Sequence, residues 1–237
     1  MKRLGLRRQD STDESNITKP LLSLLEDYQL DFHSTFRKLS SFAPSIISAS
    51  ESTNAAESAE ASVRLAIFIS ELLNGTPYPE RMVDRIDTAH TEWTAWLKKY
   101  AARIDSEKGL WKNDSVPVND ASDALEAERE REMKSVNPRF VLRQWLLEEV
   151  IKNVEGDSKT GKQVLAKVLQ VLLFFASKTS LMSDHNGDKM ATNPFENWGA
   201  EEDGRPEEEL TKEEQEERRF CGLGEKKLLG FQCSCSS

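Results

Sequence analysis

The hydrophobic positions along the chain recur at helical spacing and almost nowhere at strand spacing. The clearest pattern runs from Met82 to Ile104, where Trp93, Trp96 and Tyr100 share an apolar face and charged residues occupy the other faces. The two tryptophans lie one turn apart, which favours core anchors over a platform for stacking a ligand. The sequence therefore predicts an all-α fold, an irregular helical array.

Five further helices follow from the same periodicity. A helix with one core-facing side is expected over 20–39, because apolar residues recur there every three or four positions. The others are expected over 63–73, 124–134, 139–154 and 161–178. Asn74 and Gly75 form a stop signal, while Asn137 before Pro138 predicts a cap and a helix starting at Arg139.

Composition divides the chain into packed and unpacked parts. Only 38% of the 237 residues are hydrophobic, below the usual ~45–50%. Residues 45–62 are mostly Ala, Ser, Glu, Thr and Asn, so we expect a mobile insertion there. Residues 201–217 carry ten acidic and two basic side chains, with a capping-box pattern at Thr211 and Glu214. We expect a helical subdomain over 1–180 and a disordered, mostly flexible acidic tail over 181–237.

The net charge of −9 argues against a principal role in binding nucleic acid or an anionic membrane surface. The longest apolar run, 164–176, is interrupted by Lys167 and Gln170 and falls short of the ~20 residues that a membrane span needs. The basic first eight residues lead directly into an acidic stretch, unlike a transit peptide. No targeting signal is visible.

Two motifs resemble ligand-binding loops only in part. Gly156 to Lys162 has the spacing of a phosphate-binding loop, but a helix is expected before it and Gln163 follows the lysine, so a turn between helices is predicted. Residues 184–188 alternate like a calcium loop but lack the acidic twelfth ligand. The three histidines have no metal-ligand spacing; they are His33, His90 and His185. We expect no catalytic, cofactor or metal site in this chain.

Three cysteines lie in the last seventeen residues: Cys221, Cys233 and Cys235. Thiols near a free end can exchange disulfides with a partner, although zinc binding and tail cysteines without a role are alternatives. A link between Cys233 and Cys235 would enclose one residue and be strained. We therefore expect Cys235 to prefer a distant partner, in this chain Cys221.

Five segments carry a family likeness. They are residues 2–6 (KRLGL), 31–39 (DFHSTFRKL), 93–100, 136–143 (VNPRFVLR) and the final Cys-Ser-Ser. In this order they resemble the C-terminal portion of a fungal member of the selenoprotein O family. The likeness spans nearly the whole chain.

The resemblance implies a protein with a kinase-like fold that transfers AMP from ATP to hydroxyls of protein substrates, with ATP and magnesium as cofactors. It also implies a mitochondrial location. In many animal members a selenocysteine stands where Cys235 does and a cysteine precedes it by three residues, whereas Cys233 precedes Cys235 by two. Family members carry their nucleotide- and metal-binding residues upstream, and the sequence has no Asp-Phe-Gly, His-Arg-Asp or glycine-rich loop after a strand.

Two hypotheses follow. In the first, the chain is the C-terminal subdomain of such an AMP transferase, inactive alone, with Met1 an internal methionine and an upstream catalytic lobe as its partner. The Trp93/Trp96 and Trp145/Leu146 faces would then pack partly against that lobe. In the second, it is a stand-alone helical interaction protein with a redox tail. Transcripts extending in frame upstream of Met1 would favour the first.

Overall fold

A computed structural model describes most of the first two thirds of the chain and scattered later positions. The described residues are 1–76, 79–110, 121–138, 141, 143–156, 162, 165, 166, 206–212, 215, 218, 219, 222 and 224. Among them the regular secondary structure is helical and contains no strand, which confirms the all-α prediction. No helix in this part of the chain is long and apolar enough to span a membrane.

The chain divides into two compact units, Met1–Asn137 and Pro138–Ser237. This division falls earlier than the boundary at 180 expected from the sequence, and residues around 180 lie outside the described ones. Most of the expected acidic tail also lies outside them.

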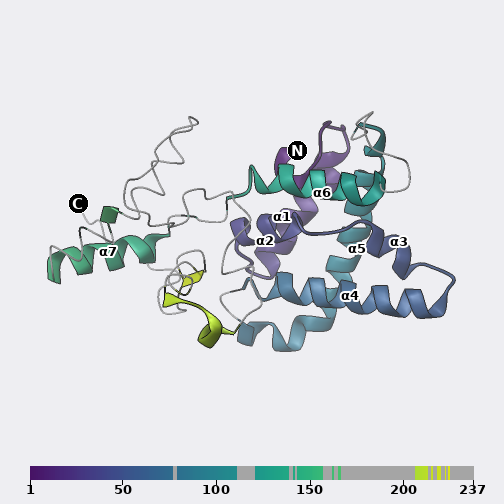
Figure 1. Cartoon of the computed structure of the whole chain (residues 1–237). Coiled ribbons are helices and arrows are strands. Elements are labelled where there is room, and N and C mark those ends of the chain that lie inside the picture. Colours follow the sequence, from purple (N-terminus) through teal and green to yellow (C-terminus); the bar gives the residue numbers. More distant parts are fainter. Residues whose placement is uncertain are drawn as a thin grey trace. The chain divides into compact units, whose positions relative to one another are not determined.

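Unit 1 is built around one long central helix, α5, with shorter helices packed along it (Figure 1). Its principal helices are α1 (Lys19–Asp27), α2 (Phe32–Leu39), α3 (Ser45–Ser50), α4 (Ala55–Leu73), α5 (Ile86–Asp105) and α6 (Ala121–Lys134). Short turns of other helix types connect them: η1 (Lys2–Leu4), η2 (Glu14–Thr18), η3 (Pro79–Arg81), η4 (Val83–Arg85) and η5 (Lys108–Leu110).

The single helix expected over 20–39 is two helices. Gln29 adopts a left-handed conformation with φ of 51°, which ends the helical path after α1. Asp31 then caps α2, because its side chain accepts a hydrogen bond from the Ser34 amide at 2.8 Å. The periodicity continues across the break since both helices bury apolar residues in the same core.

The expected mobile insertion over 45–62 is helical except at residues 51–54, so that prediction is wrong. Residues 45–50 form α3, and Asn54 caps α4 by accepting from the Ala56 amide at 3.1 Å. The Ser58 hydroxyl donates to the Ser50 carbonyl at 2.7 Å and ties the two helices together. Alanine and glutamate have a high helix propensity and favour a helix even where little apolar surface is buried. A low apolar content therefore does not by itself predict a mobile segment.

The tryptophans of α5 are core residues, as predicted. Trp93 and Trp96 are 0% and 3% exposed, and the Trp96 indole donates to the Ile17 carbonyl at 3.0 Å. This face packs inside unit 1 against α1 and η2. The burial does not require the upstream lobe that we expected to cover it.

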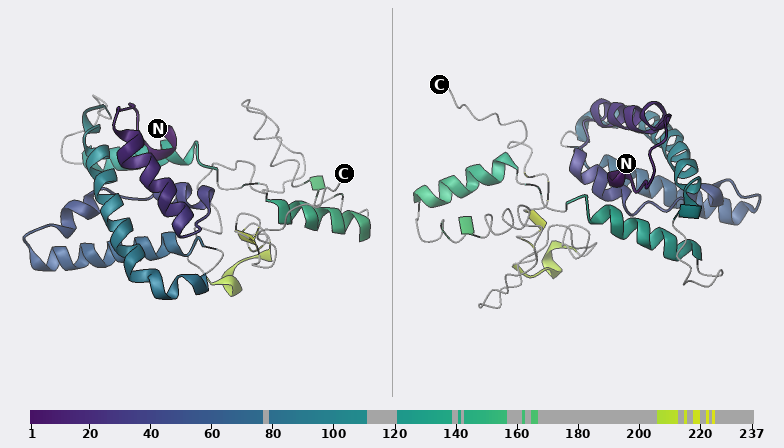
Figure 2. Two further views of the ribbon diagram at one scale, coloured as in Figure 1. Left: turned by 180° about the vertical axis from the view of Figure 1, so that it is seen from behind. Right: turned by 90° about the horizontal axis from the view of Figure 1, so that it is seen from above.

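The N-terminal residues lie inside the helical arrangement. Leu4 and Leu6 are buried in the same core as α5, and the view from above shows the N-terminus within the arc of helices (Figure 2). Residues 1–13, called the strap below, therefore contribute Leu4 and Leu6 to the core.

Unit 2 contains α7 (Gln144–Gly156) and η6 (Glu207–Glu209). The helix expected to start at Arg139 begins five residues later, and Pro138, Val141 and Arg143 are not helical. The Asn137 side chain, expected to cap this helix, bonds to the strap instead. The helix expected over 161–178 lies outside the described residues except for 162, 165 and 166, which are helical.

Candidate functional site

The cysteines proposed for redox chemistry, Cys221, Cys233 and Cys235, lie outside the described residues, as does the loop at 184–188 with His185. Gly156 ends α7, so a helix precedes the glycine-lysine motif as expected, and Lys162 is helical. Residues 157–161 lie outside the described part. Within that part no group of three or more His, Cys, Asp or Glu residues is arranged to hold a metal ion.

Ser70 and His90 form a serine–histidine contact, with the hydroxyl 3.3 Å from the ring Nε2. The Ser70 hydroxyl donates to the Ala66 carbonyl at 2.9 Å, so its proton is already directed to the backbone. A nucleophile would instead have to donate that proton to the ring. This pair stabilises the packing of α4 on α5 and does not have the geometry of an activated nucleophile.

Three of the five segments that carry the family likeness converge at one place in unit 1. We call this place the motif junction and define it by Arg3, Phe32, Arg37 and Asn137. The Asn137 Nδ2 donates to the Arg3 carbonyl at 2.9 Å, across 134 residues of sequence. The Arg3 guanidinium lies 5.8 Å from the centroid of the Phe32 ring. The strap, α2 and the end of α6 are thereby joined.

Arg37 closes the C-terminal end of α6. Its Nη1 donates to the carbonyls of Lys134 at 3.3 Å and Asn137 at 3.2 Å. A cation at this position satisfies carbonyls that have no partner within the helix and complements the negative end of the helix dipole. Arg37 is buried, so these bonds form away from water.

Gly5 lets the strap lie directly against α6. Its φ is 63°, and a Cβ there would come within 2.7 Å of the Met133 sulfur and 2.8 Å of Arg129 Cγ. Next to it, the Tyr100 hydroxyl donates to the Leu4 carbonyl at 2.6 Å. Burial raises the pKa of Tyr100 to about 12, so this hydroxyl stays protonated as the donor.

A buried ionic cluster holds the other end of the strap. Arg103 of α5 bonds both carboxylate oxygens of Asp13, at 2.6 and 3.1 Å, and its Nη2 lies 2.8 Å from Glu107. Glu107 accepts from the backbone amides of Arg7 and Arg8 at 2.8 and 3.1 Å.

The charges in this cluster set the ionisation of its members. Burial acts to raise the pKa of Asp13, but the hydrogen bonds from Arg103 and the Asp10 amide outweigh it, and the pKa is lowered. The hydrogen bond to Asp13 in turn raises the pKa of Arg103. Both groups remain charged, and the strap is held by charge-assisted bonds.

Arg129 of α6 is buried in unit 1. The residue is 2% exposed, and its guanidinium donates to the Phe42 carbonyl, to the Ser40 carbonyl at 3.5 Å and to the Met133 sulfur at 2.9 Å. It ties the chain after α2 to α6, beside Gly5 of the strap.

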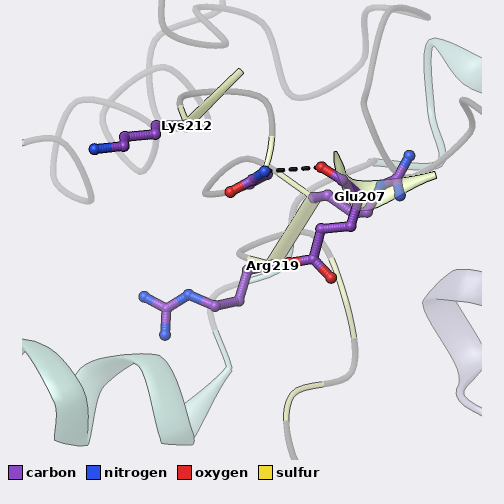
Figure 3. Close-up of a pocket in the computed structure, with 5 residues that line it drawn as sticks. Glu207, Lys212 and Arg219 are labelled. Atoms are coloured by element: carbon purple, nitrogen blue, oxygen red, sulfur yellow. Dashed lines mark hydrogen bonds between the residues drawn. The ribbon is translucent and has the colours of Figure 1, made fainter. Parts of the chain in front are cut away.

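Unit 2 contains an open pocket of about 660 Å³ (Figure 3). The residues that line it are Glu207, Lys212, Gln215, Arg218 and Arg219. The Gln215 amide donates to the Glu207 carbonyl at 2.8 Å, and the Arg219 guanidinium bonds both oxygens of Glu149 at 2.8 and 2.6 Å. Arg219 also lies 5.9 Å from the Trp145 ring. These contacts account for Arg219 as a structural residue of unit 2.

The protein-family model for the protein adenylyltransferase SelO matches residues 1–172 of the chain. The chain belongs to the SelO family. Unit 1 falls entirely within the matched region.

The relatives include the mitochondrial protein adenylyltransferase SelO of Schizosaccharomyces pombe, 30% identical over all of this chain and 30% of its own length. The SelO protein of Mus musculus, also named mitochondrial, is 26% identical over 69% of this chain and 29% of its own. The protein nucleotidyltransferase YdiU of Xanthomonas campestris is 27% identical over 71% and 25%. The chain thus spans less than a third of these relatives. No solved structure gives a significant match.

Sequence reasoning located the segments of the motif junction through the family likeness but not the contacts between them. Arg103 lies in the last turn of α5 and Glu107 follows the end of that helix by two residues, and their spacing of four indicates a surface pair. Nothing in the sequence indicated that Asp13, 90 residues away, completes the cluster or that the cluster is buried.

Proposed function

We propose that this chain supplies the helical region that supports the AMP-transferring portion of a SelO-type protein adenylyltransferase. The observation that carries the proposal is the convergence of the family-like segments on the strap at the start of the matched region. At the motif junction the side chains of Arg37 and Asn137 donate to backbone carbonyls, and the Arg3 guanidinium packs on Phe32. Contacts of this kind stabilise a fold, as expected of a supporting region.

AMP transfer to a protein hydroxyl needs a positioned metal ion and cationic groups that stabilise charge on the phosphates. In the proposed whole protein ATP and magnesium are bound by the catalytic lobe, and the protein substrate meets that lobe. The names of the yeast and mouse relatives support a mitochondrial location.

Titration calorimetry with magnesium-ATP tests the assignment of the nucleotide site to another portion. We expect no binding in the micromolar range by this chain and no transfer of labelled AMP. A micromolar dissociation constant that Lys162→Ala abolishes would contradict this, because it would place a nucleotide site at the glycine-lysine motif.

A swap protein provides the positive test. In it, the segment of the Schizosaccharomyces pombe relative that aligns with this chain is replaced by residues 1–237. If the chain is the supporting region, the swap protein transfers AMP.

We further propose that Cys235 acts as a redox residue that pairs with a distant cysteine, in this chain Cys221. Peptide mapping without reductant after mild oxidation tests this. A dominant link between Cys233 and Cys235, or recovery of all three free thiols, would contradict it.

One observation favours the second candidate, a stand-alone helical interaction protein. Unit 1 buries its own tryptophan face, so its core needs no further lobe. Transcripts extending upstream in frame would support the AMP transferase, whereas a promoter and stop codon directly before Met1 would support the stand-alone protein.

A further inference from the structure

The motif junction presents an exposed aromatic side chain next to an exposed cation. Phe32, the first residue of α2, is 38% exposed, although its ring packs 4.5 Å from that of Phe36. The Arg3 guanidinium lies over the same ring. In the part of the chain that the structure describes, no carboxylate pairs with Arg3, whereas Arg7 of the same strap bonds Glu128 and Glu132.

A buried acceptor of the same junction has no hydrogen-bond partner. Asn137 is 1% exposed, and while its Nδ2 donates to the Arg3 carbonyl, its Oδ1 has none. Folded proteins pair nearly all buried polar atoms, so an orphaned acceptor marks a place where a further donor is to be expected. It lies beside Arg3, the residue that also covers Phe32.

The position of the strap indicates which partner reaches this surface. Met1 packs on the core, and η1 contacts both α2 and α6 (Figure 1). In the proposed longer protein, the polypeptide before Met1 therefore emerges beside Arg3 and Phe32. The relatives are more than three times as long as the part that this chain matches. In the proposed longer protein, the remaining portion is therefore a large partner for unit 1.

We propose that Arg3 and Phe32 form the seat on which the AMP-transferring portion docks against unit 1. The docked portion contributes a carboxylate to Arg3 and apolar surface to the Phe32 ring. This inference rests on the proposed function and adds the interface to it. Desolvated aromatic and arginine side chains are the groups that usually anchor such interfaces.

Cysteine labelling of the swap protein and of this chain alone tests the seat. Phe32→Cys is the probe, and Val63→Cys is the matched control, since Val63 is 58% exposed on α4. Maleimide labelling is followed peptide by peptide, so the native cysteines do not interfere. We expect Phe32→Cys to react at least about tenfold more slowly in the swap protein than in the chain alone, and Val63→Cys to react equally in both.

Charge reversal provides the second measurement. Arg3→Glu should lower AMP transfer by the swap protein about fivefold or more, while Arg64→Glu, at an exposed position on α4, should leave it unchanged. Neither substitution should change the melting temperature of the chain alone. A lower melting temperature with Arg3→Glu would indicate that the role of Arg3 is purely structural.

The outcomes separate the two proposals. Equal labelling of Phe32→Cys in both proteins overturns the seat, even if the swap protein transfers AMP. An inactive swap protein overturns the proposed function. Slower labelling of Phe32→Cys in that inactive protein than in the chain alone would still support docking at the seat. Protection of Phe32→Cys in the chain alone that grows with concentration would mean that a second copy covers this face, and the seat would again be overturned.

Discussion

At the scale of single residues, the strap depends on one backbone conformation and one buried ion pair. Gly5 adopts φ of 63°, and a side chain there would meet Met133 and Arg129. Gly5→Ala should lower the free energy of unfolding by about 2 kcal/mol or more, because it adds both backbone strain and a clash. Chemical denaturation measures this. Gly109→Ala is the control, since a Cβ there meets nothing within 4 Å; equal effects of the two would contradict the account.

Asp13 makes the stability of the strap depend on pH. Its pKa is lowered in the folded protein, so its contribution is present above its ordinary pKa of about 4 and is lost as the pH falls through the lower folded value. Asp13→Asn should cost about 3 kcal/mol at pH 7, because Arg103 loses one of its two charged partners within a buried cluster. The difference from the unsubstituted chain should shrink below about pH 4.

Thermal melts of both proteins between acidic and neutral pH check this dependence. Glu14→Gln is the matched control, because its salt bridge with Lys19 is exposed and should contribute little. A constant difference between Asp13→Asn and the unsubstituted chain at every pH would exclude an ionic role for Asp13.

At the scale of elements, the separation of α1 from α2 depends on the Asp31 cap. Asp31→Ala should cost about 1 kcal/mol, because the Ser34 amide loses its acceptor. Asp31→Asn keeps a capping oxygen and should retain most of the stability. Denaturation curves compare the two, and identical losses would show that the cap is not what matters at this position.

The same elements show how far the sequence could predict the structure. Periodicity located α5 and the Trp93 face, because a long amphipathic helix depends mainly on its own pattern. Periodicity missed the break at Gln29, because the positive φ is adopted by a glutamine and not by a glycine or asparagine, which usually mark such a turn. Composition suggested mobility at 45–62, where the Asn54 cap and helix-forming alanines produce α3 and the start of α4.

The candidate site was predictable only as a set of segments. The family likeness selected the strap, α2 and the region of Asn137, but the hydrogen bond between Asn137 and Arg3 joins residues 134 positions apart. The Asn-Pro pattern predicts that Asn137 caps a helix, but in the structure its side chain donates to the Arg3 carbonyl of the strap. Long-range polar contacts of this kind have no period in the sequence.

At the scale of the whole molecule, a self-contained helical unit carries a strap that is tied at both ends. Arg103 and Glu107 hold one end and the motif junction holds the other, so a catalytic portion attached through the strap would be held in a fixed position. A self-contained core favours the stand-alone protein, although a supporting region can also fold by itself. Folding of the chain alone therefore does not separate the two hypotheses, whereas catalysis does.

The rate of AMP transfer to protein hydroxyls by the swap protein tests the central claim most directly. It is measured by mass spectrometry of the modified substrate, beside the Schizosaccharomyces pombe relative and a form of that relative without the aligned segment. The account predicts that the form without the segment is inactive and that residues 1–237 restore transfer. Full activity without the segment, or a folded swap protein that binds magnesium-ATP but transfers no AMP, would contradict a supporting role for this chain.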